Sequence, residues 1–234
     1  MINKADMQIE EPNSYQLLEK LVRGRHSCRA FSSRPVGQKE IERAFELAQC
    51  APSDCNIQPW HVYLLDGQKL EELRAALYSQ AASDTPLSYD VKPIENYSGS
   101  FLDRRRDCGW SLYGAVGVER GDREASRAQA LENYRFFGAP NVALVTSHSS
   151  TGERGVFDTG IYLGNLLLAM QAVGLAAVPQ AAIAFRTSVV RQFVAIPEEN
   201  RLICAVAFGY KEPGHPANNF RVGRAAISES VTFV

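Results

Sequence analysis

Two short segments of the chain carry the side chains best suited to chemistry. The first, residues 25–29, contains two arginines, a histidine and a serine. Because a guanidinium is a planar fork of donors that fits a phosphate bidentately, this segment is typical of an anion site. The second, residues 52–60, combines two prolines with serine, asparagine and glutamine, and such a rigid polar turn suits the edge of a flat ring. A phosphate site and a hydrogen-bonding ring site together indicate a nucleotide-like cofactor.

At this order and spacing, the two segments resemble those of the FMN-dependent nitroreductase family. The first reads Arg25-His26-Ser27-Cys28-Arg29, and the second reads Pro52-Ser53-Asp54-Cys55-Asn56-Ile57-Gln58-Pro59-Trp60. The resemblance extends from about Ser14 to the C-terminus and is weakest between residues 84 and 129. It implies an α+β fold with a central, mostly antiparallel sheet flanked by helices. It also implies an intertwined homodimer with FMN at the interface.

The resemblance implies FMN contacts from four parts of the chain. Arg25, His26 and Ser27 would hold the phosphate and the ribityl chain, and Arg29 would face the N1/C2=O edge of the isoalloxazine. A fixed cation there stabilises the negative charge of the reduced flavin, so flavin N5 carries the chemistry and no catalytic side chain is required. The turn at Pro52 would come from the partner subunit. The other expected contacts are Pro52, Ser53, Asn56, Gln58, Pro179, Gln180, Ala181, Arg221 and Arg224.

The activity implied by the resemblance is the reduction of nitroaromatic compounds by NAD(P)H in a ping-pong mechanism. Residues 79–138 would form an excursion that shapes the pocket for a small aromatic substrate such as a nitrobenzoate. The expected substrate contacts are Tyr97, Arg135 and Phe136. Quinone or enone reduction and reductive dehalogenation of halophenols are alternatives on the same scaffold. A non-catalytic FMN-binding module is an alternative of a different class.

Composition argues against several other classes of protein. The 234 residues are 45% hydrophobic and 22% charged, as expected for a single globular domain over residues 1–234. The formal net charge of −1 gives no field that favours nucleic acid or an anionic membrane. No apolar stretch reaches the roughly 18 residues of a membrane span, and we expect no signal peptide. Five scattered cysteines and four isolated histidines indicate a reducing cytoplasm and no metal site.

Helices and strands must position these residues. Apolar residues at helical spacing predict helices over residues 14–24, 38–50, 70–77, 104–118, 125–137, 155–173 and 186–195. Runs of branched apolar residues predict strands over residues 61–65, 141–146, 174–179 and 202–208. The helix over 155–173 is apolar almost all round, which indicates burial in the core or in a dimer interface. The arm over 211–234 ends in apolar residues 231–234, and we expect this end to dock on another surface, for which a second subunit is one candidate.

Overall fold

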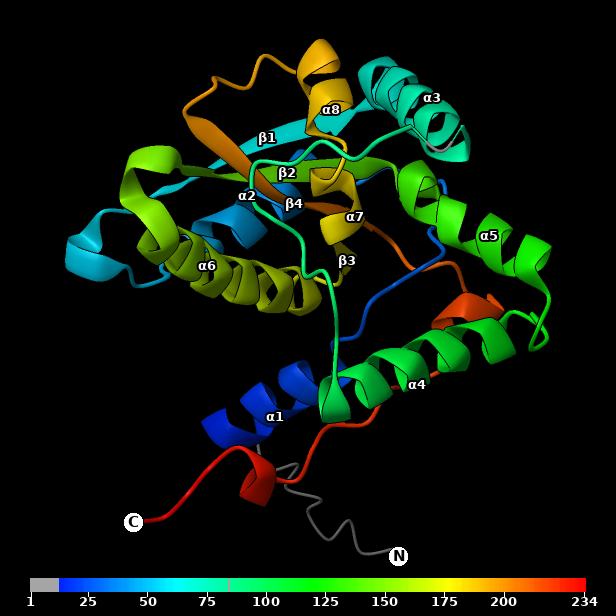
Figure 1. The fold of residues 1–234 in the computed structure, drawn as a ribbon. Helices are drawn as coiled ribbons and strands as arrows, with labels where there is room; N and C mark the ends of the chain where they lie inside the picture. Colours follow the sequence, from blue (N-terminus) through cyan, green and yellow to red (C-terminus); the bar gives the residue numbers. More distant parts are fainter. Residues whose placement is uncertain (1–12, 84) are drawn as a thin grey trace, which may run out of the picture.

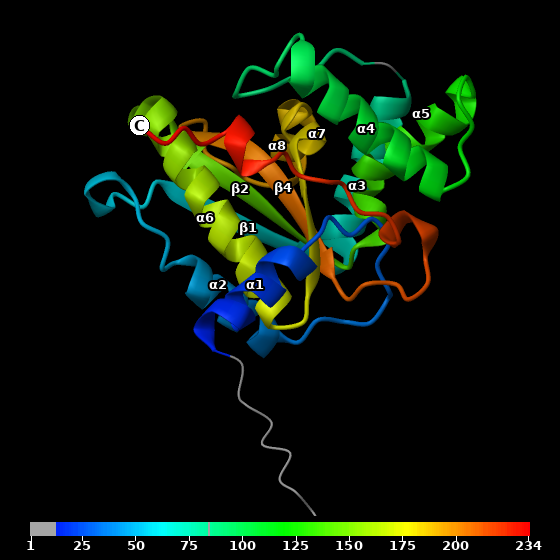
Figure 2. The ribbon, with the colours of Figure 1, turned by 90° about the horizontal axis from the view of Figure 1, so that it is seen from below.

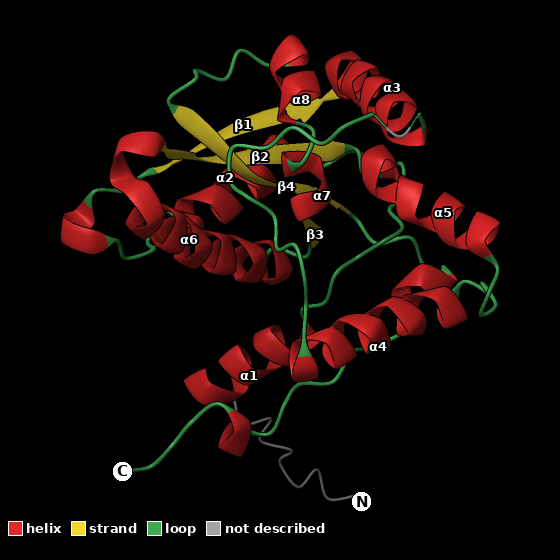
Figure 3. Cartoon of the chain, in the orientation of Figure 1, coloured by secondary structure: helices red, strands yellow, loops and turns green. Residues whose placement is uncertain are grey.

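The computed structural model describes residues 13–83 and 85–234 and shows one sheet surrounded by helices (Figure 1). The strands are β1 (Trp60–Asp66), β2 (Asn141–His148), β3 (Ala176–Gln180) and β4 (Asn200–Gly209). They lie in the order β1-β2-β4-β3, and each neighbouring pair is antiparallel. Figure 3 shows the strands at the centre of the molecule with helices around them. The expected α+β architecture with an antiparallel central sheet is confirmed.

Each face of the sheet has its own hydrophobic core. Because side chains along a strand point alternately to opposite faces, Val142 and Leu144 of β2 join one core while Ala143 and Val145 join the other. The first core is covered by α3 (Gly67–Ala82), α7 (Ala181–Ala184) and α8 (Thr187–Phe193). The second core is covered by α2 (Gln38–Ala48) and α6 (Gly152–Ala172).

Helix α6 is the central helix that its apolar composition predicts. Tyr162, Leu166 and Met170 are fully buried against the sheet, and the Tyr162 ring stacks on Trp60 with centroids 4.8 Å apart. Its other side is open, since Phe157 is 61% exposed. No helix within the described ranges is long and apolar enough to cross a membrane.

The predicted helix over residues 125–137 is wrong in its second half. Helix α5 spans Arg123–Leu131, and a 3-10 segment, η2, follows over Glu132–Gly138. Within η2, Phe136 and Phe137 have φ values of +53° and +51°, which a helix does not allow. Both rings are buried in the core with the leucines of α3, and this burial reverses the local helical preference.

Two helices and the C-terminal arm lie on one side of the sheet. The helices are α1 (Ser14–Gly24) and α4 (Gly99–Ala115). The part of the arm over residues 216–234 lies on the same side as these two helices (Figures 1 and 2). Helix α4 begins five residues before the predicted start at 104. Arg104 of α4 is paired with Glu229 of the arm at 2.7 Å. The apolar end, residues 231–234, is exposed on this chain, and its docking stays a prediction.

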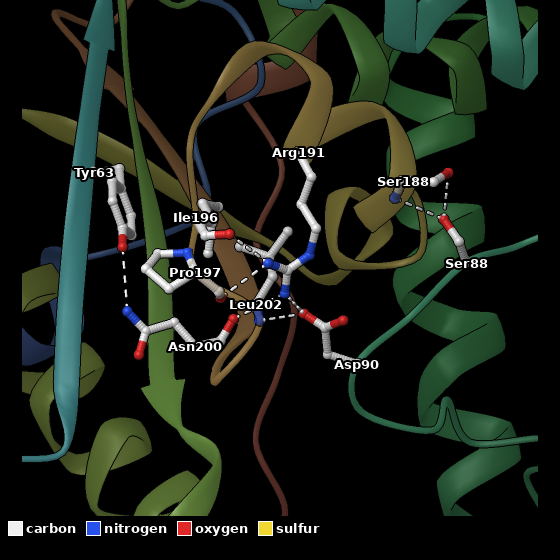
Figure 4. Close-up of polar contacts among 9 residues, drawn as sticks. All are labelled: Tyr63, Ser88, Asp90, Ser188, Arg191, Ile196, Pro197, Asn200 and Leu202. Carbon is white, nitrogen blue, oxygen red and sulfur yellow. Dashed lines mark hydrogen bonds and ion pairs between the residues drawn. The ribbon is translucent and has the colours of Figure 1, made fainter.

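The irregular segment over residues 85–98 joins this region to the sheet (Figure 4). Asp90 Oδ2 accepts hydrogen bonds from Arg191 Nη2 at 2.8 Å and from the backbone N of Leu202 at 2.7 Å. Close by, the hydroxyl groups of Ser88 and Ser188 lie 2.9 Å apart. The segment is therefore fixed at its middle to α8 and β4.

Candidate functional site

A basic cavity of about 780 Å³ lies between α1, the loop after it, α4 and the C-terminal arm. Six residues predicted to contact a cofactor line it together: Arg25, His26, Ser27, Arg29, Arg221 and Arg224. The remaining lining residues are Tyr15, Leu18, Glu19, Val22, Arg23, Cys108, Phe220 and Val222. The volume is in the range that holds a small-molecule cofactor. The structure thus brings the two predicted arginine segments, which are more than 190 residues apart in the sequence, into one cavity.

The sheet and the arm hold the loop over residues 25–29 in place. Ser27 forms a parallel bridge with Ala177, and the backbone N of Cys28 donates to Ala177 O at 3.1 Å. The backbone N of Arg29 donates to Asn218 Oδ1 at 2.7 Å. Asn218 is 1% exposed and also donates to Ala30 O at 2.8 Å. Through Asn218, the loop that carries Arg25 and Arg29 is joined to the arm that carries Arg221 and Arg224.

The positive charge of the cavity has little compensation. Glu19 is the one acidic residue of the lining, and it is already paired with Arg23 at 2.8 Å. Within residues 13–83 and 85–234, no carboxylate forms an ion pair with Arg25, Arg29, Arg221 or Arg224. Burial lowers the pKa of Arg25, and the charge of Arg224 lowers it further. Because a guanidinium stays protonated, the cavity is a site for an anion.

Arg29 keeps most of its donors free for a ligand. Burial lowers the pKa of its guanidinium, and the one hydrogen bond that the guanidinium forms with described residues, Nη1 to Ser27 O, is long at 3.4 Å. The guanidinium lies over the Phe220 ring, 5.5 Å from the centroid, in a cation–π contact that limits its orientation. Several oriented and unpaired N–H groups can therefore face a polar ring edge.

His26 presents a buried atom without a partner. Its Nδ1 lies 2.9 Å from Gly24 O, so Nδ1 carries the proton and Nε2 is the acceptor in the neutral ring. Nε2 is buried and has no hydrogen-bond partner among the described residues. Burial lowers the pKa of His26, and the nearby charges of Arg221, Lys211 and Arg25 lower it further. A neutral His26 therefore offers an acceptor that a hydroxyl group of a ligand would satisfy.

The polar turn over residues 52–58 lies outside this cavity. Pro52 and Ser53 line a separate groove of about 320 Å³ with Asp54, Arg154, Phe157, Asp158 and Ile161. The exposed Asn56 and Gln58 belong to the same turn. The segment between α2 and β1 that contains this turn extends away from α1 in both ribbon views (Figures 1 and 2). Within one chain the two predicted halves of the cofactor site are therefore apart.

The third predicted segment lies where β3 ends and α7 begins. Pro179 is half-buried and Ala181 is exposed. Gln180 is 2% exposed, and its Nε2 donates to Asn133 O at 2.8 Å while its Oε1 is buried without a partner in the described residues. The Gln180 amide thus joins β3 to η2.

None of the three predicted substrate contacts lines either of the two cavities described above. Tyr97 is 39% exposed, and the Arg105 guanidinium lies 5.3 Å from its ring centroid. Arg135 pairs with Glu132 at 3.4 Å and lies over the Tyr78 ring. Phe136 has no exposed surface, because the left-handed backbone of η2 turns its ring into the core. Phe136 is therefore not accessible to a substrate within one chain, contrary to the expectation from sequence.

Sequence reasoning did not find three residues that shape these sites. Asn218 anchors the loop at Arg29, Cys108 brings α4 into the cavity lining, and Asp158 contacts the polar turn. No motif or spacing marked them. No three His, Cys, Asp or Glu side chains gather as a metal site within the described ranges.

Comparisons with known proteins give matches over most of the chain. A family profile, "Nitroreductase family", matches residues 22–210. The chain is 36% identical to a nitroreductase of Mycolicibacterium smegmatis over 93% of each protein. It is 30% identical to a 4-nitrobenzoate reductase of Nocardioides over 94% of this chain and 90% of that protein. A crystal structure of the FMN-dependent nitroreductase from Mycobacterium smegmatis in complex with NADPH superimposes with a TM-score of 0.90 at 35% identity, covering 95% of this chain and 100% of that one.

Proposed function

The chain belongs to the nitroreductase family, and we propose that it is an FMN-dependent oxidoreductase that passes hydride from NAD(P)H to nitroaromatic compounds. The observation that carries the proposal is the arginine-lined cavity, in which Arg25, Arg29, Arg221 and Arg224 form no ion pair with a carboxylate of the described residues. Relatives that match over nine-tenths of the chain are a nitroreductase and a nitrobenzoate reductase, which supports this reaction class.

Each charged or polar group of the cavity has a role toward FMN. When bound, FMN supplies the exchange of hydride between NAD(P)H and the oxidant, which bind one after the other in a ping-pong sequence. Arg25, Arg221 and Arg224 hold the phosphate by charge-assisted hydrogen bonds. His26 accepts from a ribityl hydroxyl through Nε2. Arg29 stabilises the negative charge that reduction places at the N1/C2=O edge.

The active unit in this proposal is a homodimer with the cofactor at its interface. The polar turn over residues 52–58 lies outside the cavity of its own chain, so it completes the cavity of a second copy. Exposed apolar side chains support this assembly, including Leu18, Phe157 and Phe233 at 55%, 61% and 86% exposure. Sedimentation at micromolar concentration is expected to show a dimer. A stable monomer loaded with FMN would contradict the shared site.

The cofactor is tested directly on purified protein. We expect a yellow protein that releases FMN, rather than FAD, when it is denatured. A colourless protein that does not bind added FMN would end the proposal. Oxidation of NADH and of NADPH is then measured with nitroaromatic, quinone, enone and halophenol acceptors. No turnover with any acceptor would favour a non-catalytic FMN-binding module.

The oxidant in this proposal is a planar nitroaromatic compound that carries a carboxylate. Exposed arginines of α4 support a carboxylate contact, because Arg105 and Arg106 form no ion pair with any described residue. A desolvated contact between arginine and carboxylate contributes roughly 1.5–3 kcal/mol, or about ten- to a hundredfold in kcat/KM. Nitrobenzoate is therefore expected to exceed nitrobenzene by that factor. Charge reversal of one arginine, located between Arg104 and Arg135, is expected to remove the preference for nitrobenzoate over nitrobenzene.

The cellular compartment in the proposal is the cytoplasm. All five cysteines of the chain are free, and Cys28 and Cys204 are buried. A reducing compartment keeps such thiols unpaired. Cell fractionation with an antibody against the protein tests the assignment.

A further inference from the structure

We propose that Asp158 is a positioning residue that holds the polar turn over residues 52–58 in the conformation needed to contact FMN. This inference rests on the proposed function, because it treats that turn as half of the cofactor site. Asp158 lies on α6, is 2% exposed, and its Oδ2 accepts a hydrogen bond from the backbone N of Asp54 at 3.1 Å.

The turn has a conformation that its sequence does not favour. Cys55, Asn56 and Gln58 have φ values of +45°, +57° and +46°, in the left-handed region that residues other than glycine rarely adopt. Each such residue is held only when surrounding contacts determine the backbone. Three of them within four positions require contacts that outweigh this preference.

Contacts within the turn determine its shape but not its position. The backbone N of Gln58 donates to Ser53 Oγ at 3.0 Å, and Gln58 Nε2 donates to Asn56 O at 3.1 Å. The backbone N of Asn56 donates to Ser53 O at 3.1 Å. All of these partners move with the turn, so none of them fixes it relative to the sheet.

Asp158 supplies the contact that fixes the tip of the turn to the body of the protein. Helix α6 is itself packed on the sheet, since Tyr162, one turn of helix after Asp158, is 2% exposed and stacks on Trp60 of β1. The other contact from α6 to the tip is Arg154 Nε to Asp54 Oδ2 at 3.9 Å, between side chains that are 64% and 56% exposed. An exposed pair at that distance contributes little. The buried carboxylate of Asp158 is therefore the anchor of the tip.

The test compares FMN binding with stability in three variants. In Asp158→Ala the acceptor is lost, and we expect apoprotein to bind FMN roughly tenfold more weakly, as the loss of a hydrogen bond to a charged group predicts. In Asp158→Asn an amide oxygen replaces the carboxylate oxygen, and binding is expected to stay within about threefold of wild type. Asp54→Pro removes the donor without touching α6. Ser53 before it is already extended (φ −144°, ψ 161°), as a residue before proline must be.

Thr159→Val is the matched control. Thr159 is the next residue of α6, is fully buried, and donates its hydroxyl to Gly155 O at 2.7 Å within the helix. Its loss removes one buried hydrogen bond from the same helix but none from the turn. We expect this variant to lower the melting temperature of the apoprotein while FMN affinity stays at the wild-type value. Thermal unfolding and fluorescence titration with FMN are measured on all variants.

Non-additivity completes the test. If the two groups act through one hydrogen bond, the double variant Asp158→Ala/Asp54→Pro binds FMN no more weakly than either single variant. The inference is overturned if Asp54→Pro binds FMN as tightly as wild type, or if Asp158→Asn is as weak as Asp158→Ala. It is also overturned if Thr159→Val weakens FMN binding as much as Asp158→Ala. Failure of wild-type apoprotein to bind FMN would instead refute the proposed function.

Discussion

The sheet body and the cavity wall differ in how their side chains are buried. The sheet body, which comprises β1–β4 with α2, α3, α6, α7 and α8, contains both hydrophobic cores apart from their loop and η2 members. The cavity wall comprises α1, the loop over residues 25–29, α4 and the arm over residues 216–234. Every residue of α1 and α4 is described, and neither helix contains a fully buried one. The sheet body is therefore held together by its own cores, while the wall leaves charged and apolar side chains at least partly exposed.

The polar anchors of the two regions differ in the same way. The pair between Asp90 and Arg191 joins side chains that are 19% and 24% exposed, and both groups also bond to backbone atoms (Figure 4). The pair between Arg104 and Glu229 joins side chains that are 47% and 53% exposed. Burial and additional hydrogen bonds decide what an ion pair contributes, so the first pair is expected to stabilise the protein and the second is not.

The largest expected effect is on the anchor of the sheet body. Asp90→Ala removes the acceptor for Arg191 and for the backbone N of Leu202 and is expected to lower the free energy of unfolding by about 2–4 kcal/mol. Urea denaturation of the apoprotein measures the loss. Lys92→Ala is the control on the same segment, because the pair between Lys92 and Glu95 is about two-thirds exposed on both sides. Equal stability of the two variants would contradict the comparison.

In the cavity wall, the largest expected effect is on the ligand and not on folding. Arg25→Ala removes a phosphate contact worth roughly 1.5–3 kcal/mol, so FMN affinity should fall about ten- to a hundredfold. The apoprotein should lose no stability, because the substitution relieves repulsion between Arg25 and Arg224. Titration with FMN and thermal unfolding without FMN separate the two effects. A large drop in apoprotein stability would show that Arg25 supports the fold.

The sheet body was also the part of the fold most accessible from sequence. Apolar spacing located the start of α2, and β1, β2 and β4 within two residues at each end. It failed over residues 132–138, where two consecutive phenylalanines adopt a left-handed backbone. Their conformation follows from burial against α3, about 60 residues earlier in the chain, and no local pattern encodes such a contact.

For the site, sequence identified the residues whose chemistry is unusual and missed those that position them. Arg25 and Arg29 were found because an anion site requires particular side chains within a short segment. Asn218 and Asp158 are ordinary polar residues whose partners lie 189 and 104 positions away. The separation of the loop from the polar turn within one chain likewise becomes visible only in three dimensions.

The next effect distinguishes Arg29 from Arg25 within the cavity wall. If Arg29 faces the N1/C2=O edge, Arg29→Ala should lower the reduction potential of bound FMN by about 30–60 mV, the equivalent of roughly 1.4–2.8 kcal/mol for two electrons. Flavin reduction by NAD(P)H should slow more than FMN binding weakens. Arg25→Ala should leave the potential unchanged, because a phosphate contact is the same in both redox states. Equal reduction potentials of FMN in the two variants would contradict the separate roles proposed for Arg29 and Arg25.

A smaller effect concerns pH and His26. The folded apoprotein holds the pKa of His26 below the ordinary value of 6.5, so in acid the unfolded chain binds a proton that the folded chain does not. Stability should therefore fall as the pH decreases through about 6.5, and should be constant in this respect above about pH 7.5. His26→Gln should flatten the dependence of the melting temperature on pH between 5 and 7.5. His61→Gln, at an exposed position, should leave this dependence unchanged. If both variants keep the wild-type slope of melting temperature against pH, His26 is not the group responsible.

The smallest expected effect is on the ion pair of the cavity wall. Arg104→Gln removes the contact with Glu229, but an exposed pair contributes at most about 1 kcal/mol and is screened further by salt. We expect the free energy of unfolding of the apoprotein to change by less than about 1 kcal/mol in dilute buffer. In about 1 M salt we expect no change in this free energy. Amide exchange in α4 should nevertheless become faster, because α4 has no buried residue to hold it once the arm is released. A loss of stability as large as that of Asp90→Ala would mean that the cavity wall is anchored as firmly as the sheet body, and the contrast between the two regions would not hold.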